Sequence, residues 1–200
     1  MVRLALYDYG AGNIFSLKNS FEKRGATVQV INSLSNDDNN YSGLLLPGVG
    51  SFDTAMHSLS ADMIHSYVKD TMPVLGICLG MEMFFERSQE GSCKGLSIMN
   101  GEVVSLPDTM KVPHMGWNSL HIQHSGTLLD GMDDGSWMYF VHSYMAKPND
   151  DSLVTATSDY GIRVPAVVEY RNYFGTQFHP EKSGASGGII LDNFMRECSH

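Results

Sequence analysis

The sequence predicts an α/β fold with three layers (α/β/α), in which a central, mostly parallel sheet carries antiparallel additions and helices cover both faces. Two observations predict it. In the first half of the chain, short apolar segments alternate with segments of helical periodicity, which is the pattern of parallel strands joined by helices. In the second half, strand-like segments follow one another with only turns between them, as antiparallel strands do.

Four short strands are expected in the first half. They are the apolar or β-branched segments 3–8, 27–31, 43–46 and 74–77. Glycine-containing turns follow the first strand at 9–12 and the third at 47–50. Ligands of such sheets bind beyond the carboxyl ends of the strands. We therefore expect these two turns, and the residue after the fourth strand, to lie at a functional site.

Helices are expected between these strands. Ile14, Leu17 and Phe21 recur at helical spacing, Asn13 can cap that helix, and Gly25 can end it. The other expected helical segments are 51–69, 79–87 and a closing helix from about 188 to 198.

The second half consists mainly of strand-like segments separated by turns. These segments are 101–105, 119–123, 137–144, 153–158, 166–170 and 173–178. Arg171 and Asn172 can form a two-residue hairpin turn between the last two. A chain of 200 residues with 42% hydrophobic content can bury one sizeable core, and no Pro/Ser-rich linker divides it. We therefore expect residues 1–200 to form a single domain.

Composition and charge exclude several classes of function. The net charge of −9 disfavours nucleic acids and anionic membranes as partners. No apolar run approaches the length of a membrane span, and the N-terminal apolar stretch is too short for a signal peptide. The 3 cysteines lack metal-like spacing and indicate a reducing compartment without a disulfide framework. We expect a soluble cytoplasmic enzyme, or a subunit of one, with no metal and no cofactor.

Cys78 has the sequence context of a nucleophile elbow, a sharp turn that joins a buried strand directly to a helix. Gly76 and Gly80 flank it, and such a turn needs very small neighbours. A thiol at the start of a helix is favoured as the thiolate, which is the attacking form. The alternative is a structural, buried cysteine behind a glycine turn.

A catalytic thiolate needs a base and a group that orients the base. His179 ends an apolar strand and is followed by proline. In an extended segment Glu181 projects to the same side as His179, so its carboxylate could hold the imidazole. Cys78, His179 and Glu181 are therefore a candidate catalytic triad. Oxyanion donors would be the Leu79 amide and the 47–50 loop, for which an ordinary turn is the alternative.

These residues, together with several other motifs, resemble the class I glutamine amidotransferases, a family that uses a Cys-His-Glu triad. The motifs are 8–13, 47–50, 76–80, 113–118, 139–144 and 179–181. The resemblance covers essentially the whole chain. It implies the family's fold and the hydrolysis of glutamine to glutamate and ammonia through a thioester on Cys78.

The chain is most similar to the branch of that family whose members serve histidine biosynthesis. The resemblance implies a heterodimer, in which a (β/α)₈-barrel cyclase receives the ammonia without its release. It implies that the residues around glutamine are Gly48, Val49, Gly50, Leu79, Glu82, Glu90, His142, Ser143 and Tyr144. It implies that the residues facing the cyclase are Asn13, Trp117, Tyr139 and Lys182. For Trp117 and Tyr139 the alternative is packing in the core.

Two residues depart from the family pattern. Glu82 stands where the family usually has Gln, and Phe15 where it often has a basic residue. An ionised carboxylate cannot donate a hydrogen bond, and its charge opposes thiolate formation. Glu82 is therefore expected to be turned away from the site, protonated, or paired with the substrate ammonium. We expect an altered contact with glutamine and not a lost activity.

Three other functions remain open at this level. The chain could be an independent cysteine hydrolase of γ-glutamyl or peptide substrates. It could be a glutaminase that feeds a sugar-modifying synthetase. It could also be a scaffold with a decayed site, although the intact Cys78, His179 and Glu181 argue against that reading.

Overall fold

A computed structural model describes residues 1–10, 14–34, 41–68 and 71–199. Its main feature is an eight-stranded mixed sheet in the order β2-β1-β3-β4-β13-β12-β11-β8. The parallel strands are β1 (Arg3–Tyr7), β2 (Thr27–Ile31), β3 (Gly43–Leu46), β4 (Val74–Ile77) and β13 (Tyr173–Thr176). The antiparallel additions are β12 (Arg163–Tyr170), β11 (Val154–Asp159) and β8 (His121–Ile122).

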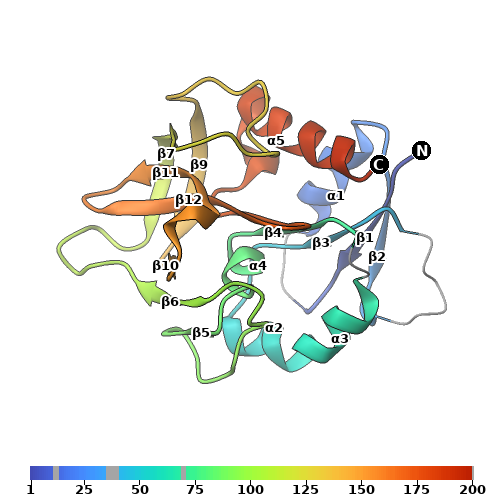
Figure 1. Cartoon of the computed structure of the whole chain (residues 1–200), viewed down its shortest axis with the longest axis horizontal. Helices are drawn as coiled ribbons and strands as arrows, with labels where there is room; N and C mark the ends of the chain where they lie inside the picture. The colour runs from blue at the N-terminus through green and yellow to red at the C-terminus, as the bar shows by residue number, and fades with distance from the viewer. Residues whose placement is uncertain (11–13, 35–40, 69–70, 200) are drawn as a thin grey trace.

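Side chains of the parallel strands alternate between two cores, one on each face of the sheet. In β1, Ala5 and Tyr7 pack into one core, while Leu4 and Leu6 pack into the other. The first core is closed by α2 (Phe52–Ser58) and α3 (Ala61–Tyr67), and the second by α1 (Ile14–Glu22) and α5 (Gly184–Glu197). Figure 1 shows these two pairs of helices on opposite faces of the sheet. The predicted three-layer fold is confirmed.

The predicted turn at Arg171 and Asn172 is also confirmed. Strands β12 and β13 pair antiparallel, with Tyr170 opposite Tyr173. The Asn172 side chain donates a hydrogen bond to the carbonyl of Met72 at 2.6 Å, just before β4 begins. The hairpin thereby brings the segment that follows β13 beside the end of β4.

The predicted helix over 51–69 is two helices. Leu59 and Ser60 have extended backbone conformations, and the Ser60 hydroxyl caps α3 by accepting a hydrogen bond from the amide of Met63 at 3.2 Å. A serine at this position favours the start of a new helix over continuation of the preceding one, because its hydroxyl accepts a hydrogen bond from an otherwise free amide of the new helix. Lys69, the predicted end, lies outside the described residues.

The predicted helix over 79–87 is a single turn, α4 (Leu79–Glu82). The carbonyls of Met83, Phe84 and Phe85 accept hydrogen bonds from backbone amides in the segment 96–99. They are therefore not available to continue an α-helix. This segment, which is distant in sequence, overrides a local preference for helix.

Several strands of the second half form small separate sheets and do not join the large one. One contains β10 (Tyr144–Pro148), β6 (Gly101–Ser105) and β5 (Arg87–Ser88), and another contains β7 (His114–Ser119) and β9 (Trp137–His142). The predicted strand 137–144 is therefore two strands that meet at Ser143. Strands β5 and β7 were not predicted. The described residues also form the short 3₁₀ helices η2 (Asp151–Leu153) and η3 (Pro180–Lys182). Helix α5 begins earlier than predicted, at Gly184.

None of the helices in the described ranges is both long and apolar enough to cross a membrane.

The turn after β4 depends on two glycines. A Cβ at Gly80 would lie 2.2 Å from the carbonyl oxygen of Leu46, and a Cβ at Gly76 would lie 2.5 Å from that of Gly80. Both neighbouring atoms belong to the backbone and cannot rotate away. The predicted need for small residues on both sides of Cys78 is therefore a steric requirement.

We expect Gly80→Ala to destabilise the protein by about 3 kcal/mol, because α4 must move away from β3. Gly131→Ala serves as the control. Gly131 has a φ of +74° but no neighbouring heavy atom within 4 Å, so we expect a cost of about 1 kcal/mol from backbone strain alone. Urea denaturation measures both free energies of unfolding. Equal losses for the two variants would show that the turn can relax.

Candidate active site

Cys78 lies at the carboxyl end of β4, in the middle of the large sheet, where that strand joins α4. Its backbone has φ 49° and ψ −106°, a conformation that is strained for any residue other than glycine. Its amide donates a hydrogen bond to the carbonyl of Thr176 at 2.6 Å, which fixes the turn to β13. This is the sharp, strained turn that the sequence predicted.

His179 and Glu181 follow β13, the neighbour of β4. The Nδ1 atom of His179 lies 2.9 Å from Oε1 of Glu181, and both side chains are buried. The sequence predicted this contact for an extended segment, but Glu181 belongs to the 3₁₀ helix η3. The contact was therefore predicted correctly from an incorrect backbone conformation.

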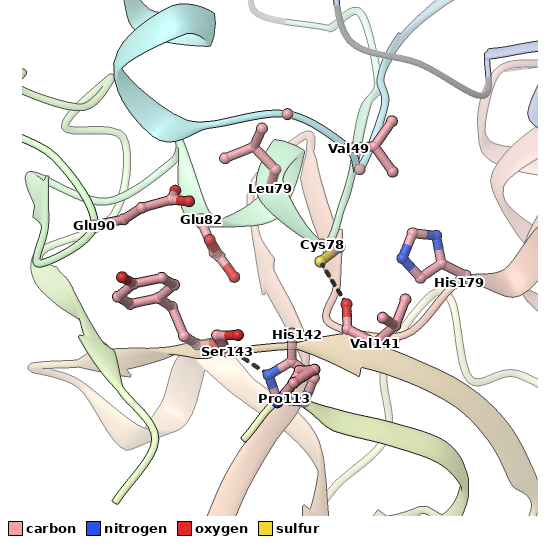
Figure 2. Close-up of a pocket in the computed structure, with 13 residues that line it drawn as sticks. Val49, Cys78, Leu79, Glu82, Glu90, Pro113, Val141, His142, Ser143 and His179 are labelled. Carbon is pink, nitrogen blue, oxygen red and sulfur yellow. Dashed lines mark hydrogen bonds between the residues drawn. The ribbon is translucent and has the colours of Figure 1, made fainter. Parts of the chain in front are cut away.

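Gly48 brings the loop after β3 against both Cys78 and His179. A Cβ built on Gly48 would lie 3.0 Å from Cε1 of His179 and 3.1 Å from Cβ of Cys78. The Nε2 atom of His179 is buried and has no hydrogen-bond partner in the described part of the chain. Figure 2 shows the His179 ring beside Cys78, across from the glutamate side chains. The imidazole therefore has a free nitrogen available on the Cys78 side of the site.

A cavity of about 330 Å³ opens beside Cys78 and His179, a volume suited to a small metabolite. It is lined by all the residues predicted to surround the substrate, which are Gly48, Val49, Gly50, Leu79, Glu82, Glu90, His142, Ser143 and Tyr144. Pro113 and Val141 also line it; they lie within the motifs 113–118 and 139–144, but neither had a predicted role of its own. Figure 2 shows Glu82 and Glu90 together on one side of Cys78.

Glu82 faces the cavity, which contradicts the alternative that it is turned away. Its side chain is buried, and its Oε1 atom accepts a hydrogen bond from Nε2 of Gln177 at 3.1 Å. Burial raises the pKa of Glu82 to about 8. The Gln177 hydrogen bond opposes this rise in pKa, and the charge of Glu90 adds to it. Near neutral pH the protonated form is therefore favoured.

Gln177 is a site residue that sequence reasoning missed. Its Nε2 atom also lies 3.7 Å from Sγ of Cys78, so one amide contacts both the thiol and Glu82. An amide side chain inside an apolar segment does not by itself indicate a role in catalysis. The position of Gln177 two residues before His179 could have indicated one, because both side chains lie on the same side of an extended chain.

The thiol of Cys78 is neutral in this state of the chain. Burial raises its pKa well above the usual value, and the charge of Glu82 raises it further, while hydrogen bonds from the Leu79 amide and Gln177 lower it. The thiol donates a long hydrogen bond of 3.8 Å to the carbonyl of Val141. The amide at the start of α4 does favour the thiolate, as expected, but burial has the larger effect on the pKa, so the predicted thiolate is not the favoured form here.

The predicted interface residues lie on one side of the β7–β9 sheet and at η3. Trp117 is 53% exposed, and its ring meets that of Tyr139 edge-on with centroids 6.0 Å apart. Its exposure excludes packing in the core. Met115 and Trp137 are exposed on the same face of the two strands. Lys182 belongs to η3, and Asn13 lies outside the described residues.

The described residues contain no group of three or more His, Cys, Asp or Glu side chains that could hold a metal ion. The cysteines Cys78, Cys93 and Cys198 are free thiols.

The chain matches one protein family over almost its whole length. Residues 5–198 match the model of the family described as glutamine amidotransferase class-I. The chain is 45% identical over 206 residues to the imidazole glycerol phosphate synthase subunit HisH of Geobacillus thermodenitrificans, which covers 98% of this chain and 96% of the relative. It is 45% identical to the protein of the same name from Geobacillus kaustophilus, with 96% and 95% covered.

The fold has counterparts among solved structures. The crystal structure of a glutamine amidotransferase from Thermotoga maritima superposes with a TM-score of 0.74, covering 100% of this chain and 99% of the other. The sequence identity is 14%, so this likeness concerns the fold alone.

The buried Glu82 predicts a pH dependence of stability. Its pKa rises from an ordinary value of 4.5 to about 8 on folding. The unfolded chain therefore releases this proton first, and the free energy of unfolding falls as pH rises from about 5 to 8, by up to roughly 1.4 kcal/mol per pH unit. We expect Glu82→Gln to remove this fall. Urea denaturation at several pH values measures it, with Glu197→Gln as the control. Parallel stability curves for Glu82→Gln and the unsubstituted protein would contradict the assignment.

Proposed function

Because the chain belongs to the class I glutamine amidotransferases, we propose that it hydrolyses L-glutamine as the glutaminase subunit of an imidazole glycerol phosphate synthase. The observation that carries the proposal is the meeting of Cys78 and His179 at one cavity, with the Glu181 carboxylate against the far nitrogen of His179. The nearly full-length similarity to relatives with that name supports it. The whole of residues 1–200 would act as one glutaminase domain.

Catalysis would begin with transfer of the Cys78 proton to Nε2 of His179. The thiolate attacks the side-chain amide carbon of glutamine, and Glu181 stabilises the imidazolium that forms. The proton then passes from His179 to the leaving nitrogen, ammonia departs, and a thioester remains on Cys78. Water, deprotonated by His179, hydrolyses the thioester to glutamate and regenerates the thiol.

Two parts of the cavity would bind charged groups, which are the oxyanion of the intermediates and the α-ammonium of glutamine. The oxyanion of each tetrahedral intermediate would receive hydrogen bonds from the amide of Leu79 and from the loop that contains Val49. The carboxyl groups of Glu82 and Glu90 both line the same cavity, and that of Glu90 would face the α-ammonium of glutamine. His142, Ser143 and Tyr144 form the opposing part of the lining.

The exposed face of the β7–β9 sheet would bind the synthase partner. An exposed cluster of large apolar side chains marks an interaction surface in a protein with net charge −9. We assign Trp117, Tyr139 and Lys182 to this interface, together with Asn13. The partner would be a (β/α)₈-barrel cyclase of the lyase class. It would use ammonia to form imidazole glycerol phosphate in histidine biosynthesis, within a cytoplasmic heterodimer.

We expect Cys78→Ser to lower glutamine hydrolysis by at least about 1,000-fold, because no other thiol lies beside His179. In complex with the cyclase, ammonium salts should still support formation of the cyclase product. The measurements are glutamate release and product formation by the complex. Cys93→Ser and Cys198→Ser are the controls and should remain active. A requirement for either of these cysteines would overturn the scheme with one nucleophile.

The unsubstituted chain alone should hydrolyse glutamine very slowly, and the cyclase with its nucleotide substrate should accelerate it. Full activity of the isolated chain would instead indicate an independent hydrolase of γ-glutamyl substrates. Acceleration by a sugar-modifying synthetase would indicate a different pathway.

Glu82→Gln should lower the Michaelis constant for glutamine by roughly fivefold. A glutamine side chain has the same shape, donates a hydrogen bond at every pH and removes the charge that opposes the Cys78 thiolate. Steady-state kinetics of the complex near pH 8 measures the effect. An unchanged or higher Michaelis constant would show that the carboxyl group itself is the better contact.

A further inference from the structure

Glu90 reaches the cavity from a loop, residues 89–95, that follows the two-residue strand β5. Its Oε2 atom accepts a hydrogen bond from the backbone amide of Phe52, the first residue of α2, at 2.9 Å. The amide of Glu90 donates to the hydroxyl of Ser88 at 3.1 Å. The position of this carboxylate is therefore set by the start of α2.

Asp53, the next residue of α2, is also hydrogen-bonded to this loop. Here the helix residue supplies the acceptor and the loop supplies the donors. Its Oδ1 atom accepts hydrogen bonds from the backbone amides of Ser92 and Cys93, both at 2.9 Å. Its Oδ2 atom accepts from the Ser92 hydroxyl at 3.2 Å. The amides of Cys93 and Ser92 are the largest causes that lower the pKa of Asp53 to about 2. The carboxylate is thus ionised and held by the loop.

The loop is shaped to admit this carboxylate. A Cβ on Gly91 would lie 2.1 Å from Oδ1 of Asp53. A larger residue would displace the Asp53 carboxylate or push the loop away from α2. Residues on both sides of Gly91 are therefore tied to adjacent residues of one helical turn, Glu90 to Phe52, and Ser92 and Cys93 to Asp53. We call this set of hydrogen bonds the Asp53 clasp.

The clasp exceeds what α2 needs for its own stability. The Ser51 hydroxyl already caps α2 by accepting from the amide of Thr54 at 3.4 Å. Helix α3 begins in the same way, with Ser60 as its cap and Asp62 at the position equivalent to Asp53. Among the described residues, neither helix contributes to the lining of the cavity, but α2 directly follows the lining loop that contains Gly48, Val49 and Gly50. The contacts of Asp53 with the loop are therefore an addition specific to the helix beside the active site.

We propose that Asp53 is a positioning residue for the substrate, which acts through Glu90. The clasp fixes the Glu90 carboxylate at the cavity, where it receives the α-ammonium of glutamine. The inference rests on the proposed function, and it adds the residue that sets affinity for the amino-acid end of glutamine.

The test compares Asp53→Asn with Asp62→Asn, which alters the equivalent charge in α3. In the complex with the cyclase and its nucleotide substrate, Asp53→Asn should raise the Michaelis constant for glutamine about tenfold and leave kcat nearly unchanged. Asp62→Asn should change neither. Gly91→Ala displaces the same carboxylate from the loop side and should reproduce the effect of Asp53→Asn.

A second substrate separates positioning from general loosening of the loop. Glutaramate is glutamine without its α-amino group, so Glu90 has no ammonium to bind. Asp53→Asn should leave the Michaelis constant for glutaramate unchanged. An equal rise for both substrates, or no rise for glutamine, would overturn the role of Asp53 while leaving the glutaminase function intact. Absence of glutamine hydrolysis by the unsubstituted complex would overturn the proposed function and this inference together.

Discussion

The close approach of the Cys78 turn to the backbone of β3 is the constraint on which the rest of the site depends. Gly80 lies against the carbonyl of Leu46, and this contact leaves no room for a side chain. The strand order β3-β4-β13 then determines what surrounds the thiol, because parallel neighbours end at the same edge of the sheet. The loop after β3 provides Gly48 on one side of Cys78, and the segment after β13 provides His179 on the other. The site is therefore assembled by strand order.

Burial also keeps three titratable groups of the cavity uncharged. Burial raises the pKa values of the Cys78 thiol and Glu82, and it lowers the pKa of His142 to about 4. All three groups are therefore neutral near pH 7, since a low-dielectric site disfavours each charged form. In the proposed scheme the α-ammonium of glutamine pairs with Glu90, while the protonated Glu82 can donate a hydrogen bond to the substrate.

Much of this arrangement could be predicted from local sequence, and the remainder depends on contacts between distant segments. Gly76, Cys78 and Gly80 specify their turn through their own sizes and positions. The length of the following helix could not be predicted from local sequence, since amides of the segment 96–99 donate hydrogen bonds to the carbonyls of Met83, Phe84 and Phe85. The same limit applies to the site. The partners of Glu82 and Glu90 are Gln177 and Phe52, which no periodicity brings near them.

The β7–β9 sheet connects the proposed interface to the cavity by the direction of one strand. Trp137 begins β9 in solvent, Tyr139 packs against Trp117, and Val141 lines the cavity and accepts the Cys78 hydrogen bond. Because alternate residues share a face, these three side chains form one continuous row. Beneath that row, Nδ1 of His114 lies 3.0 Å from Nε2 of His142, whose other ring nitrogen lies 2.7 Å from the carbonyl of Tyr144. A partner bound to the exposed part of this row would contact the same strand that lines the cavity, so any shift of the two-stranded sheet would reach the cavity.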